Sequence, residues 1–292
     1  MVNRKKILIT GSKGQLGRSF KKISKAYNYN FIFTDKSNLD ITNFELLREF
    51  FKNNKIDTLI NCVAYTNVDN AQIKKNICNN VNHKAIGFLS KLCEKFNIQL
   101  IHISTDYVFD GKKDSLYNES DFTEPLNNYG LSKLQGEKAV MNYNLKNSII
   151  IRTSLLYYDN GDSFVNKIIN KIIKGENIDV VNDQFSSPTY AIDLSHAILK
   201  IIPLISDNST QIYHYSNVGF CSRYDLAKKI NELLDGNSKI YPIKSNQDIV
   251  SRPLFSVLSS AKIINKFNIE IRKWEVALKE YILQQNIKLD EI

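Results

Sequence analysis

The sequence holds few of the residues that build metal centres or disulfide frameworks. Its 292 residues include only four cysteines and four histidines. The cysteines lie far apart, without a C-x-x-C pair, at Cys62, Cys78, Cys93 and Cys221. Because zinc sites and disulfide scaffolds need closely spaced ligands or a dense cysteine pattern, we expect neither in this protein.

Long apolar runs are also missing from the chain. No segment approaches the roughly eighteen apolar residues of a membrane span. The start of the sequence, MVNRKKILITG, passes into a strand-like segment without the apolar core of a signal peptide. We therefore expect a cytoplasmic protein with no membrane partner.

Acidic residues are fewer than basic ones, at 30 against 39, which gives a formal net charge of +9. The lysines and arginines are spread through nearly every segment, and NRKK is the one compact basic cluster. An evenly basic surface lacks the cationic stripe of a nucleic-acid-binding face, although it mildly favours anionic ligands such as nucleotides. We expect no nucleic-acid partner.

Apolar strand-like segments alternate with helical segments in the first half of the chain. The strand-like segments are KKILIT (5–10), FIFTD (31–35), TLINCV (58–63), QLIHIST (99–105) and SIIIRTS (148–154), and the helical ones cover 16–26, 44–51, 81–96 and a stretch that includes Leu131. Near-continuous apolar strands separated by helices are typical of a parallel sheet covered on both faces. The predicted fold class is α/β, with a Rossmann-type doubly wound parallel sheet that binds ligands beyond the carboxyl ends of its strands.

The alternation loosens after about residue 160. Helices are predicted over 164–174, 194–202, 224–234 and 274–283, with strands at IDVV (178–181) and QIYHYS (211–216). We predict a dinucleotide-binding domain over 1–160 and a smaller α/β substrate-binding lobe over 161–292, and leave open that the chain crosses between the two. A cleft is expected between them.

Three glycines follow the first predicted strand in TGSKGQLG. Gly11, Gly14 and Gly17 are spaced three residues apart, with a strand before them and a helix after them. Glycines let the backbone turn sharply and approach a pyrophosphate, whose charge then meets the N-terminus of the helix. The segment predicts a dinucleotide site, with a merely tight turn as the alternative.

Asp35 ends the second predicted strand. An acidic side chain about twenty residues after the glycines hydrogen-bonds an adenosine ribose and favours NADH. The neighbouring Lys36 and the loop residues Ser12 and Lys13 would instead accommodate the 2′-phosphate of NADPH. For Asp40, further along, an adenine contact and a turn or helix-cap role stay open.

A phenol and an ammonium lie four residues apart in YGLSK, at Tyr129 and Lys133. In a helix this spacing places both side chains on one face, about one turn apart. A surface aromatic beside a solvated lysine is the alternative that the pentapeptide alone leaves open.

Four segments together carry a family resemblance: TGSKGQLG, NCVAYTNVD, STDYVFDG and YGLSK resemble the extended short-chain dehydrogenase/reductases. More narrowly, they are similar to the dTDP-4-dehydrorhamnose reductases, and the similarity continues through DQFSSPTYAIDLS and RPLFSVL. The resemblance implies NADPH-dependent reduction of the C4 ketone of a dTDP-linked 6-deoxysugar, with NADH as the alternative cofactor.

The same resemblance implies a catalytic set of Thr105, Tyr129 and Lys133. Reduction leaves an alkoxide that needs a proton, which Tyr129 would donate. Lys133 would lower the pKa of the phenol, which is about 10 when free, and would hold the nicotinamide ribose, while Thr105 would hydrogen-bond the carbonyl oxygen. Ser104 is an alternative to Thr105. Asn82 resembles an asparagine of a proton relay, with a helix-surface position as its alternative.

The resemblance also assigns binding residues. The cofactor set comprises Gly11, Lys13, Gly14, Gln15, Leu16, Asp35, Asp40, Ile41, Ala64, Tyr65, Thr66, Tyr129 and Lys133. The substrate set comprises Val68, Asp69, Thr105, Asp106 and Arg252. For Tyr65 a core position is the alternative, and for Arg252 a surface charge.

Three departures from the family pattern bear on the substrate. Leu155 stands where relatives carry a tryptophan beside the sugar, and Phe255 replaces an asparagine. Some relatives dimerise through magnesium, but Ser19 stands at the matching acidic position, so we expect no metal and leave a homodimer open. A non-catalytic regulatory subunit and a nucleotide-sugar epimerase are the alternative functions.

Overall fold

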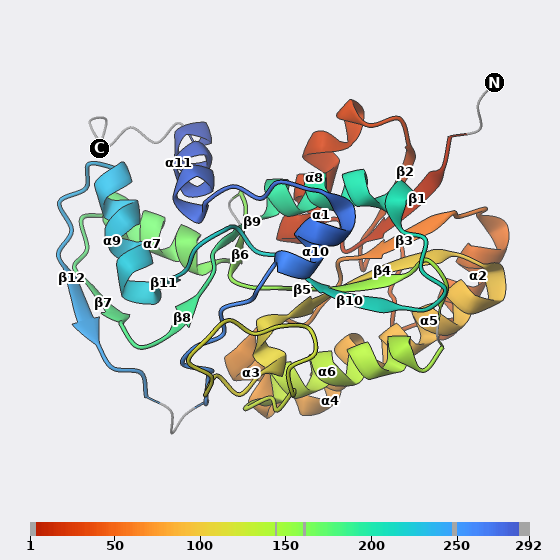
Figure 1. Cartoon of the computed structure of the whole chain (residues 1–292), viewed down its shortest axis with the longest axis horizontal. Helices are drawn as coiled ribbons and strands as arrows, with labels where there is room; N and C mark the ends of the chain where they lie inside the picture. Colours follow the sequence, from red (N-terminus) through yellow and green to blue (C-terminus); the bar gives the residue numbers. More distant parts are fainter. Residues whose placement is uncertain (1–3, 144, 160–161, 247–249, 286–292) are drawn as a thin grey trace.

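Six parallel strands form the central sheet of the protein. The structure is a computed structural model that describes residues 4–143, 145–159, 162–246 and 250–285. The strands lie in the order β10-β5-β4-β3-β1-β2 (Figure 1). Their bounds are β1 (Lys6–Thr10), β2 (Asn30–Thr34), β3 (Thr58–Asn61), β4 (Gln99–Thr105), β5 (Ile149–Thr153) and β10 (Gln211–His214). The predicted fold class is confirmed.

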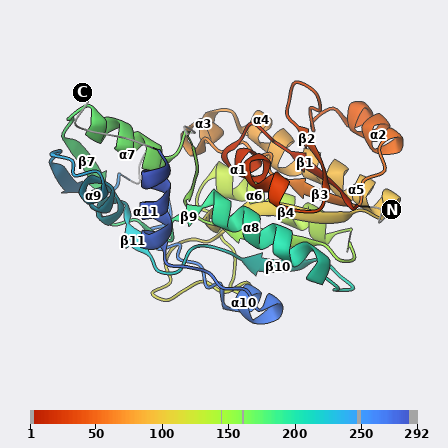
Figure 2. The same cartoon turned by 90° about the horizontal axis from the view of Figure 1, so that it is seen from above.

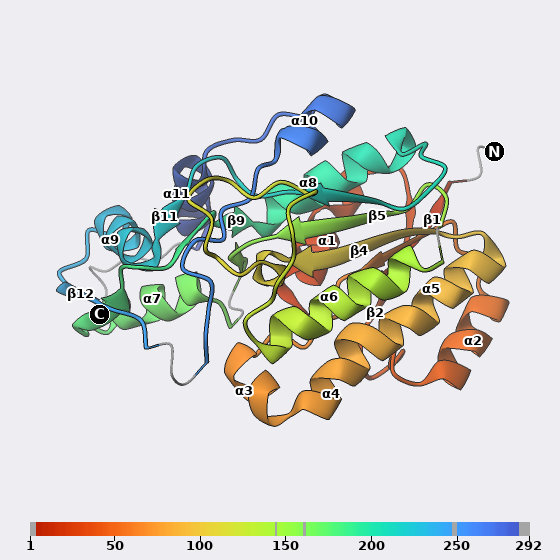
Figure 3. The same cartoon turned by 60° about the horizontal axis from the view of Figure 1, so that its bottom comes forward.

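Helices cover both faces of this sheet because its strands are apolar on both sides. On one face lie α2 (Phe44–Asn53), α5 (Ala85–Phe96) and α6 (Asn128–Met141), packed through one apolar cluster (Figure 3). On the other face α1 (Gln15–Ile23) and α8 (Ala191–Ile201) share a second cluster. A turn of 3-10 helix (Ser24–Ala26) extends α1, as the predicted helix over 16–26 requires.

The predicted helix over 81–96 is interrupted at its start. Residues Asn80–Lys84 form a π-helical turn that runs into α5, and two short helices, α3 (Val68–Ile73) and α4 (Lys75–Asn79), precede it. π-Helical turns are rare and occur mainly at functional sites. This turn carries Asn82.

A second group of elements packs beside the sheet, around its own apolar cluster (Figure 2). It contains α7 (Phe164–Ile173), α9 (Arg223–Leu233), α11 (Trp274–Gln284) and the parallel pair β7 (Ile178–Val181) and β12 (Ile240–Ile243). Short strands pair as β6 (Leu156–Tyr157) with β9 (Thr189–Tyr190) and β8 (Phe185–Ser186) with β11 (Cys221–Ser222). Helix α10 (Ala261–Phe267) lies against β10 and completes the fold.

The segment QIYHYS corrects one sequence-based placement. We assigned it to the second lobe, but β10 pairs in parallel with β5, with Ile212 opposite Ile150. The chain therefore crosses back to the main sheet after α8. The predicted domain boundary between residues 160 and 161 lies outside the described residues, and the division at that point stays a prediction.

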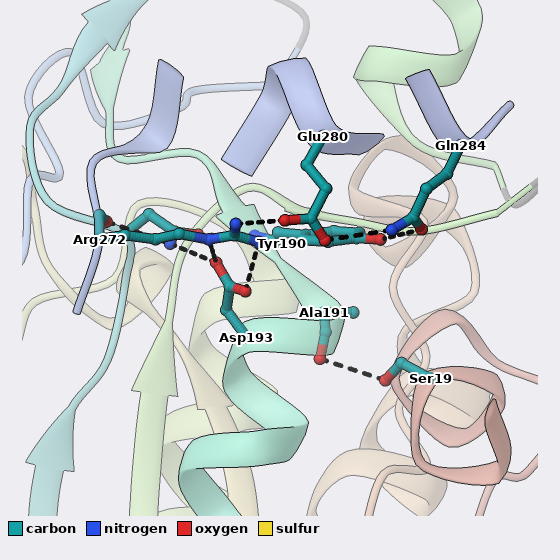
Figure 4. A network of polar contacts seen from close by, with 8 residues as sticks. Ser19, Tyr190, Ala191, Asp193, Arg272, Glu280 and Gln284 are labelled. Carbon is teal, nitrogen blue, oxygen red and sulfur yellow. Dashed lines mark hydrogen bonds and ion pairs between the residues drawn. The ribbon is translucent and has the colours of Figure 1, made fainter. Parts of the chain in front are cut away.

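Arg272 joins α8 to α11. Its Nη2 and Nε donate to the two carboxylate oxygens of Asp193 at 2.7 and 2.8 Å, and Nη1 donates to Glu280. The guanidinium lies over the Tyr190 ring, 5.9 Å from its centroid (Figure 4). A planar guanidinium satisfies two carboxylates and an aromatic face at once, so this residue fixes α11 against the sheet domain.

Ser19 lies near the same junction, on α1. Its hydroxyl contacts the Leu16 and Ala191 carbonyl oxygens at 2.7 and 3.2 Å, and the Ser195 hydroxyl at 2.5 Å. Figure 4 shows the contact with Ala191. Ser19 therefore serves helix packing between α1 and α8. Within the described ranges, no three His, Cys, Asp or Glu side chains are grouped as metal ligands.

Among the described residues, no helix is both long and apolar enough to cross a bilayer.

Candidate active site

The glycine-rich loop makes a close turn between β1 and α1. Gly11 has φ of +73°, and a Cβ atom there would lie 2.9 Å from the Val63 backbone nitrogen. A Cβ atom on Gly17 would lie 2.3 Å from the Gly11 carbonyl oxygen. Gly14 caps α1, so no cap side chain takes the N–H groups of its first turn. The loop thus has the backbone approach and free helix N-terminus that bind phosphate.

A cavity of about 520 Å³, here called the glycine-loop cavity, opens beside this loop. Asp35 lines it at the end of β2 and accepts hydrogen bonds from the Ser37 hydroxyl and backbone N–H at 2.5 and 2.8 Å. Lys13 forms an ion pair with Asp35 at 3.0 Å. The bonds from Ser37, together with Lys13, lower the pKa of Asp35 to about 2. The carboxylate is therefore ionised at neutral pH, and Lys13 partly neutralises it.

Asp40 and Ile41 lie outside the lining of the glycine-loop cavity and of the second cavity described below. The Asp40 carboxylate accepts from the Thr42 N–H and hydroxyl at 2.9 and 2.7 Å, which is a local turn. Ile41 is 3% exposed and packs in the core beneath α2 and α5. Neither is among the described residues that line the glycine-loop cavity or its neighbour. Their cofactor contacts stay a prediction.

A second cavity of about 600 Å³, the tyrosine cavity, shares Lys13, Gly14 and Ala64 with the first. Its wall includes the predicted residues Gln15, Leu16, Thr66, Val68, Asp69, Thr105, Asp106, Tyr129, Lys133 and Arg252. Segments spread over more than two hundred residues of sequence thus meet around one space. A volume of this size lies within the range of pockets that bind small ligands.

The first two turns of α6 place Tyr129 and Lys133 at this cavity. Asn127 caps the helix by accepting from the Gly130 N–H at 2.9 Å. A Cβ atom on Gly130 would lie 2.1 Å from the Tyr107 carbonyl oxygen, so only glycine lets α6 approach the end of β4 this closely. Tyr129 and Lys133 then lie one turn apart on the same cavity wall.

Lys133 is 1% exposed, and its ammonium donates to the Ile103 carbonyl oxygen at 2.6 Å. Burial lowers the pKa of Lys133 to about 8, against the opposing pull of Glu137. Burial also raises the pKa of Tyr129 above its ordinary value, and a hydrogen bond with Thr105 opposes that rise. The net shift of the Tyr129 pKa is upward because desolvation of the phenolate is the largest effect, and the lowering contribution of Lys133 stays a prediction.

Asp106 is the polar centre of the wall next to Tyr129. It is 3% exposed, and its carboxylate accepts from Ser154 at 2.9 Å, Ser256 at 2.5 Å and Thr105 at 3.0 Å. Burial raises its pKa, and these three hydroxyls oppose the rise. The Thr105 proton thus points at Asp106, and must leave it before Thr105 can donate to a substrate carbonyl. Ser256, in RPLFS, was not predicted.

Ser104 lines the tyrosine cavity together with Thr105. Its hydroxyl donates to Glu137 at 2.5 Å, and the choice of Thr105 over Ser104 stays a prediction. Glu137 forms a buried ion pair with Arg152 at 2.7 Å, and the two side chains are 2% and 3% exposed. Arg152 also lies 3.5 Å from the buried His214. This network fixes α6 to β4 and β5, and the predicted catalytic side chains lie on α6 and β4.

Asn82 is fully buried, so the helix-surface alternative is wrong. Its amide accepts from the Tyr65 N–H at 2.8 Å and donates to the Tyr65 carbonyl at 3.0 Å and the Ser132 hydroxyl at 3.0 Å. Asn82 therefore holds the loop after β3 that presents Ala64 and Thr66 to the cavity. Tyr65 is partly buried, and its own cofactor contact stays a prediction.

The substrate residues predicted on both sides of the cavity meet each other. Arg252 donates to the Asp69 carboxylate at 2.5 Å, although 183 residues separate them in sequence. Leu155, in the place of the family tryptophan, lines the cavity with φ of +42°. Phe255 packs instead with Phe185 and Phe220, at 6.5 and 5.7 Å between ring centroids.

Five residues of the second lobe were missed as cavity residues: Asp162, Ser163, Phe164, Lys167 and Arg223. The first two directly precede α7, and the other three lie on α7 or α9, which the sequence predicted only as helices. No short motif surrounds them, and only the path of the chain brings both helices to the cavity. Sequence spacing alone held no signal for them.

The chain matches the family model described as RmlD substrate binding domain over residues 5–287. It is 34% identical to a dTDP-4-dehydrorhamnose reductase of Aggregatibacter actinomycetemcomitans, over 94% of this chain and 97% of the relative. A solved structure of a dTDP-4-dehydrorhamnose reductase from Clostridium acetobutylicum is 35% identical, with a TM-score of 0.90 over 97% of this chain and 100% of that one.

A second solved structure, a dTDP-4-dehydrorhamnose reductase from Bacillus anthracis in complex with NADP, is 32% identical. Its TM-score is 0.91, over 97% of this chain and 100% of that chain. The three similarities and the family model all span nearly the whole sequence. The chain therefore belongs to the dTDP-4-dehydrorhamnose reductase family.

Proposed function

We propose that this protein reduces the C4 ketone of a dTDP-linked 6-deoxysugar with NADPH, and that its substrate is dTDP-4-dehydro-L-rhamnose. The observation that carries this proposal is the meeting of Thr105, Tyr129 and Lys133 in one cavity that continues into the glycine loop. A binding-only protein has no chemical need for that set.

The residues present fit a nicotinamide dinucleotide. A Cβ atom at Gly11 or Gly17 would collide with neighbouring backbone atoms, so the close turn of this loop requires glycine at both positions. Such a glycine turn lets the backbone approach a phosphate closely. The two cavities share Lys13, Gly14 and Ala64, so one elongated ligand can occupy both. Gly11, Gly14 and Leu16 would hold its pyrophosphate, Asp35 its adenosine ribose, and Lys133 its nicotinamide ribose.

When bound, the cofactor supplies the hydride that the ketone carbon accepts. The Tyr129 phenol donates a proton to the ketone oxygen, which would otherwise become an alkoxide. Because the pKa of this phenol is raised in the cavity, Tyr129 stays protonated, and so competent as an acid, across the physiological range. Lys133, charged below about pH 8, stabilises the phenolate that remains after transfer. Asp106 orients Thr105 beside the phenol.

The proposal is tested by mixing the purified protein with NADPH and freshly prepared dTDP-4-dehydro-L-rhamnose, and following absorbance at 340 nm. We expect one NADPH oxidised for each dTDP-L-rhamnose formed. Conversion of a nucleotide sugar without net NADPH oxidation would favour an epimerase. Tight NADPH binding without oxidation, over a panel of dTDP-4-ketosugars, would favour a regulatory subunit.

Two further predictions accompany this function: a cytoplasmic location and a homodimer. The first stays a prediction. The homodimer is checked by size-exclusion chromatography with light scattering. A mass near twice that of the 33.6 kDa chain supports it.

A further inference from the structure

Arg223 is held firmly at the edge of the tyrosine cavity. It is the first residue of α9 and lies between Ser222 and Asp225, which form a capping box through reciprocal hydrogen bonds. Its backbone N–H donates to the Gln184 carbonyl oxygen at 3.2 Å. The backbone of this arginine is therefore fixed from both sides, and its side chain lines the cavity.

The guanidinium group of Arg223 stacks on an aromatic ring, but one of its hydrogen-bond donors has no partner among the described residues. It lies over the Phe164 ring, 5.0 Å from the centroid. Its Nη1 is buried, and no hydrogen-bond partner for it exists among the residues that the structure describes. Buried donors are normally paired, and the buried guanidinium of Arg152 is paired with Glu137. An unpaired donor at a cavity wall marks a place where a ligand acceptor completes the bond.

Two other cations at this end of the cavity already have carboxylate partners. Arg252 pairs with Asp69 at 2.5 Å, and Lys167 pairs with Asp162 at 2.7 Å. Arg223 has no carboxylate within ion-pair distance in the described part of the chain. Unlike Arg252 and Lys167, Arg223 can therefore offer its charge to a bound anion, although it also helps to lower the pKa of the buried Asp106.

Resting on the proposed function, we propose that Arg223 binds the diphosphate of the nucleotide-linked sugar, with Phe164 supporting the guanidinium from below. The diphosphate is the permanent anion of such a substrate, and a planar guanidinium donates two parallel hydrogen bonds to phosphate oxygens. Arg252, which the resemblance assigns to the substrate, forms an ion pair with Asp69, and its own substrate contact stays a prediction. This assignment gives the second lobe a specific part in recognition.

Calorimetric titration of the full chain, saturated with NADP⁺, with dTDP tests the assignment. We expect Arg223→Gln to weaken dTDP binding about 10- to 100-fold, the loss that corresponds to a charge-assisted hydrogen bond. Arg223→Lys should recover part of the affinity. Arg48→Gln, on the exposed face of α2, is the matched control and should bind dTDP like the wild type. NADP⁺ affinity and the melting temperature of each variant establish that it folds.

Thymidine distinguishes phosphate recognition from base or sugar recognition. Arg223→Gln should leave thymidine affinity unchanged, since the nucleoside carries no phosphate. A dTDP dissociation constant within twofold of the wild type would overturn the assignment, as would equal losses for dTDP and thymidine. Absence of dTDP binding to the wild type would overturn it too.

Failure of the proposed function gives a different pattern. If the wild type binds dTDP but oxidises no NADPH with any dTDP-4-ketosugar, the reductase function fails, and Arg223 is judged on the dTDP titration alone. If the wild type turns over and Arg223→Gln raises the KM for the ketosugar at unchanged kcat, the assignment is supported. Unchanged KM with full turnover would overturn it while the function stands.

Discussion

The two ends of the cleft are built from different kinds of sequence. At the cofactor end, the glycine loop and Asp35 lie within the first 35 residues, each directly after a strand of the parallel sheet. At the substrate end, Asp69, Phe164, Arg223 and Arg252 come from four separate segments. The residues that we propose as catalytic lie between these ends, on β4 and α6.

The cofactor end thus depends on residues close in sequence, whereas the substrate end depends on contacts between segments that are distant in sequence. A phosphate loop needs one strand, three glycines and one helix, so its chemistry is complete within a short segment. The substrate wall exists only after α7 and α9 pack beside the sheet. Substitution of a proposed catalytic residue should therefore abolish turnover and leave cofactor binding intact. Substitution at the substrate end should instead change the affinity and specificity for the nucleotide sugar.

The largest effect is expected for Tyr129→Phe. Removing the phenol removes the proton donor, so turnover should fall by about 10²- to 10⁴-fold. NADPH affinity should stay nearly unchanged, since the ring keeps its packing against Tyr107 at 5.8 Å. Steady-state kinetics and cofactor titration measure the two quantities separately. Turnover above a tenth of the wild-type value would remove Tyr129 from the role of proton donor.

Glu137→Gln tests the framework beneath the catalytic residues. The change leaves Arg152 buried without its carboxylate partner, and breaking a buried pair costs about 3–5 kcal/mol. Urea denaturation of the wild type and of Glu137→Gln measures the difference in their free energies of unfolding. A double variant, Glu137→Met with Arg152→Met, should be less destabilised than the single one because no unpaired charge remains. Equal loss in both would contradict this explanation.

The pH dependence of kcat/KM tests Lys133. Since its pKa is lowered to about 8, the ammonium loses its proton as the pH rises through that value. Activity should therefore hold below about pH 8 and fall above it, approaching tenfold per pH unit. Lys133→Arg, which stays charged, should lack this decline in whatever activity it retains. Lys138→Arg, exposed on the same helix, should keep the wild-type profile.

The smallest effect is expected for Asp35→Asn. The pKa of Asp35 is about 2, so its carboxylate carries a negative charge where a ribose 2′-phosphate would approach. Removing that charge should raise the preference for NADPH over NADH a few-fold, as a ratio of kcat/KM values. Glu49→Gln, on the exposed side of α2, is the control. A shift toward NADH would show that Asp35 does not face the ribose.

The sequence predicted most of the sheet and the residues at its strand ends, because apolar strands and glycine spacing are local signals. It missed the two-residue strands β6, β8, β9 and β11, which are too short to show a period. It placed β10 in the wrong lobe, since pairing with β5 depends on the path of the chain. Arg223 was missed for the same reason, and the raised pKa of Tyr129 depends on burial that no pentapeptide reveals.

Deuterium transfer tests the central claim most directly. NADPH carrying deuterium at both C4 positions of the nicotinamide is mixed with dTDP-4-dehydro-L-rhamnose and the protein, and the product is analysed by NMR and mass spectrometry. We predict one deuterium at sugar C4 for each NADPH consumed, and no labelled product with Tyr129→Phe on the same timescale. A converted but unlabelled sugar, or labelling at full rate in the Tyr129→Phe variant, would contradict the account.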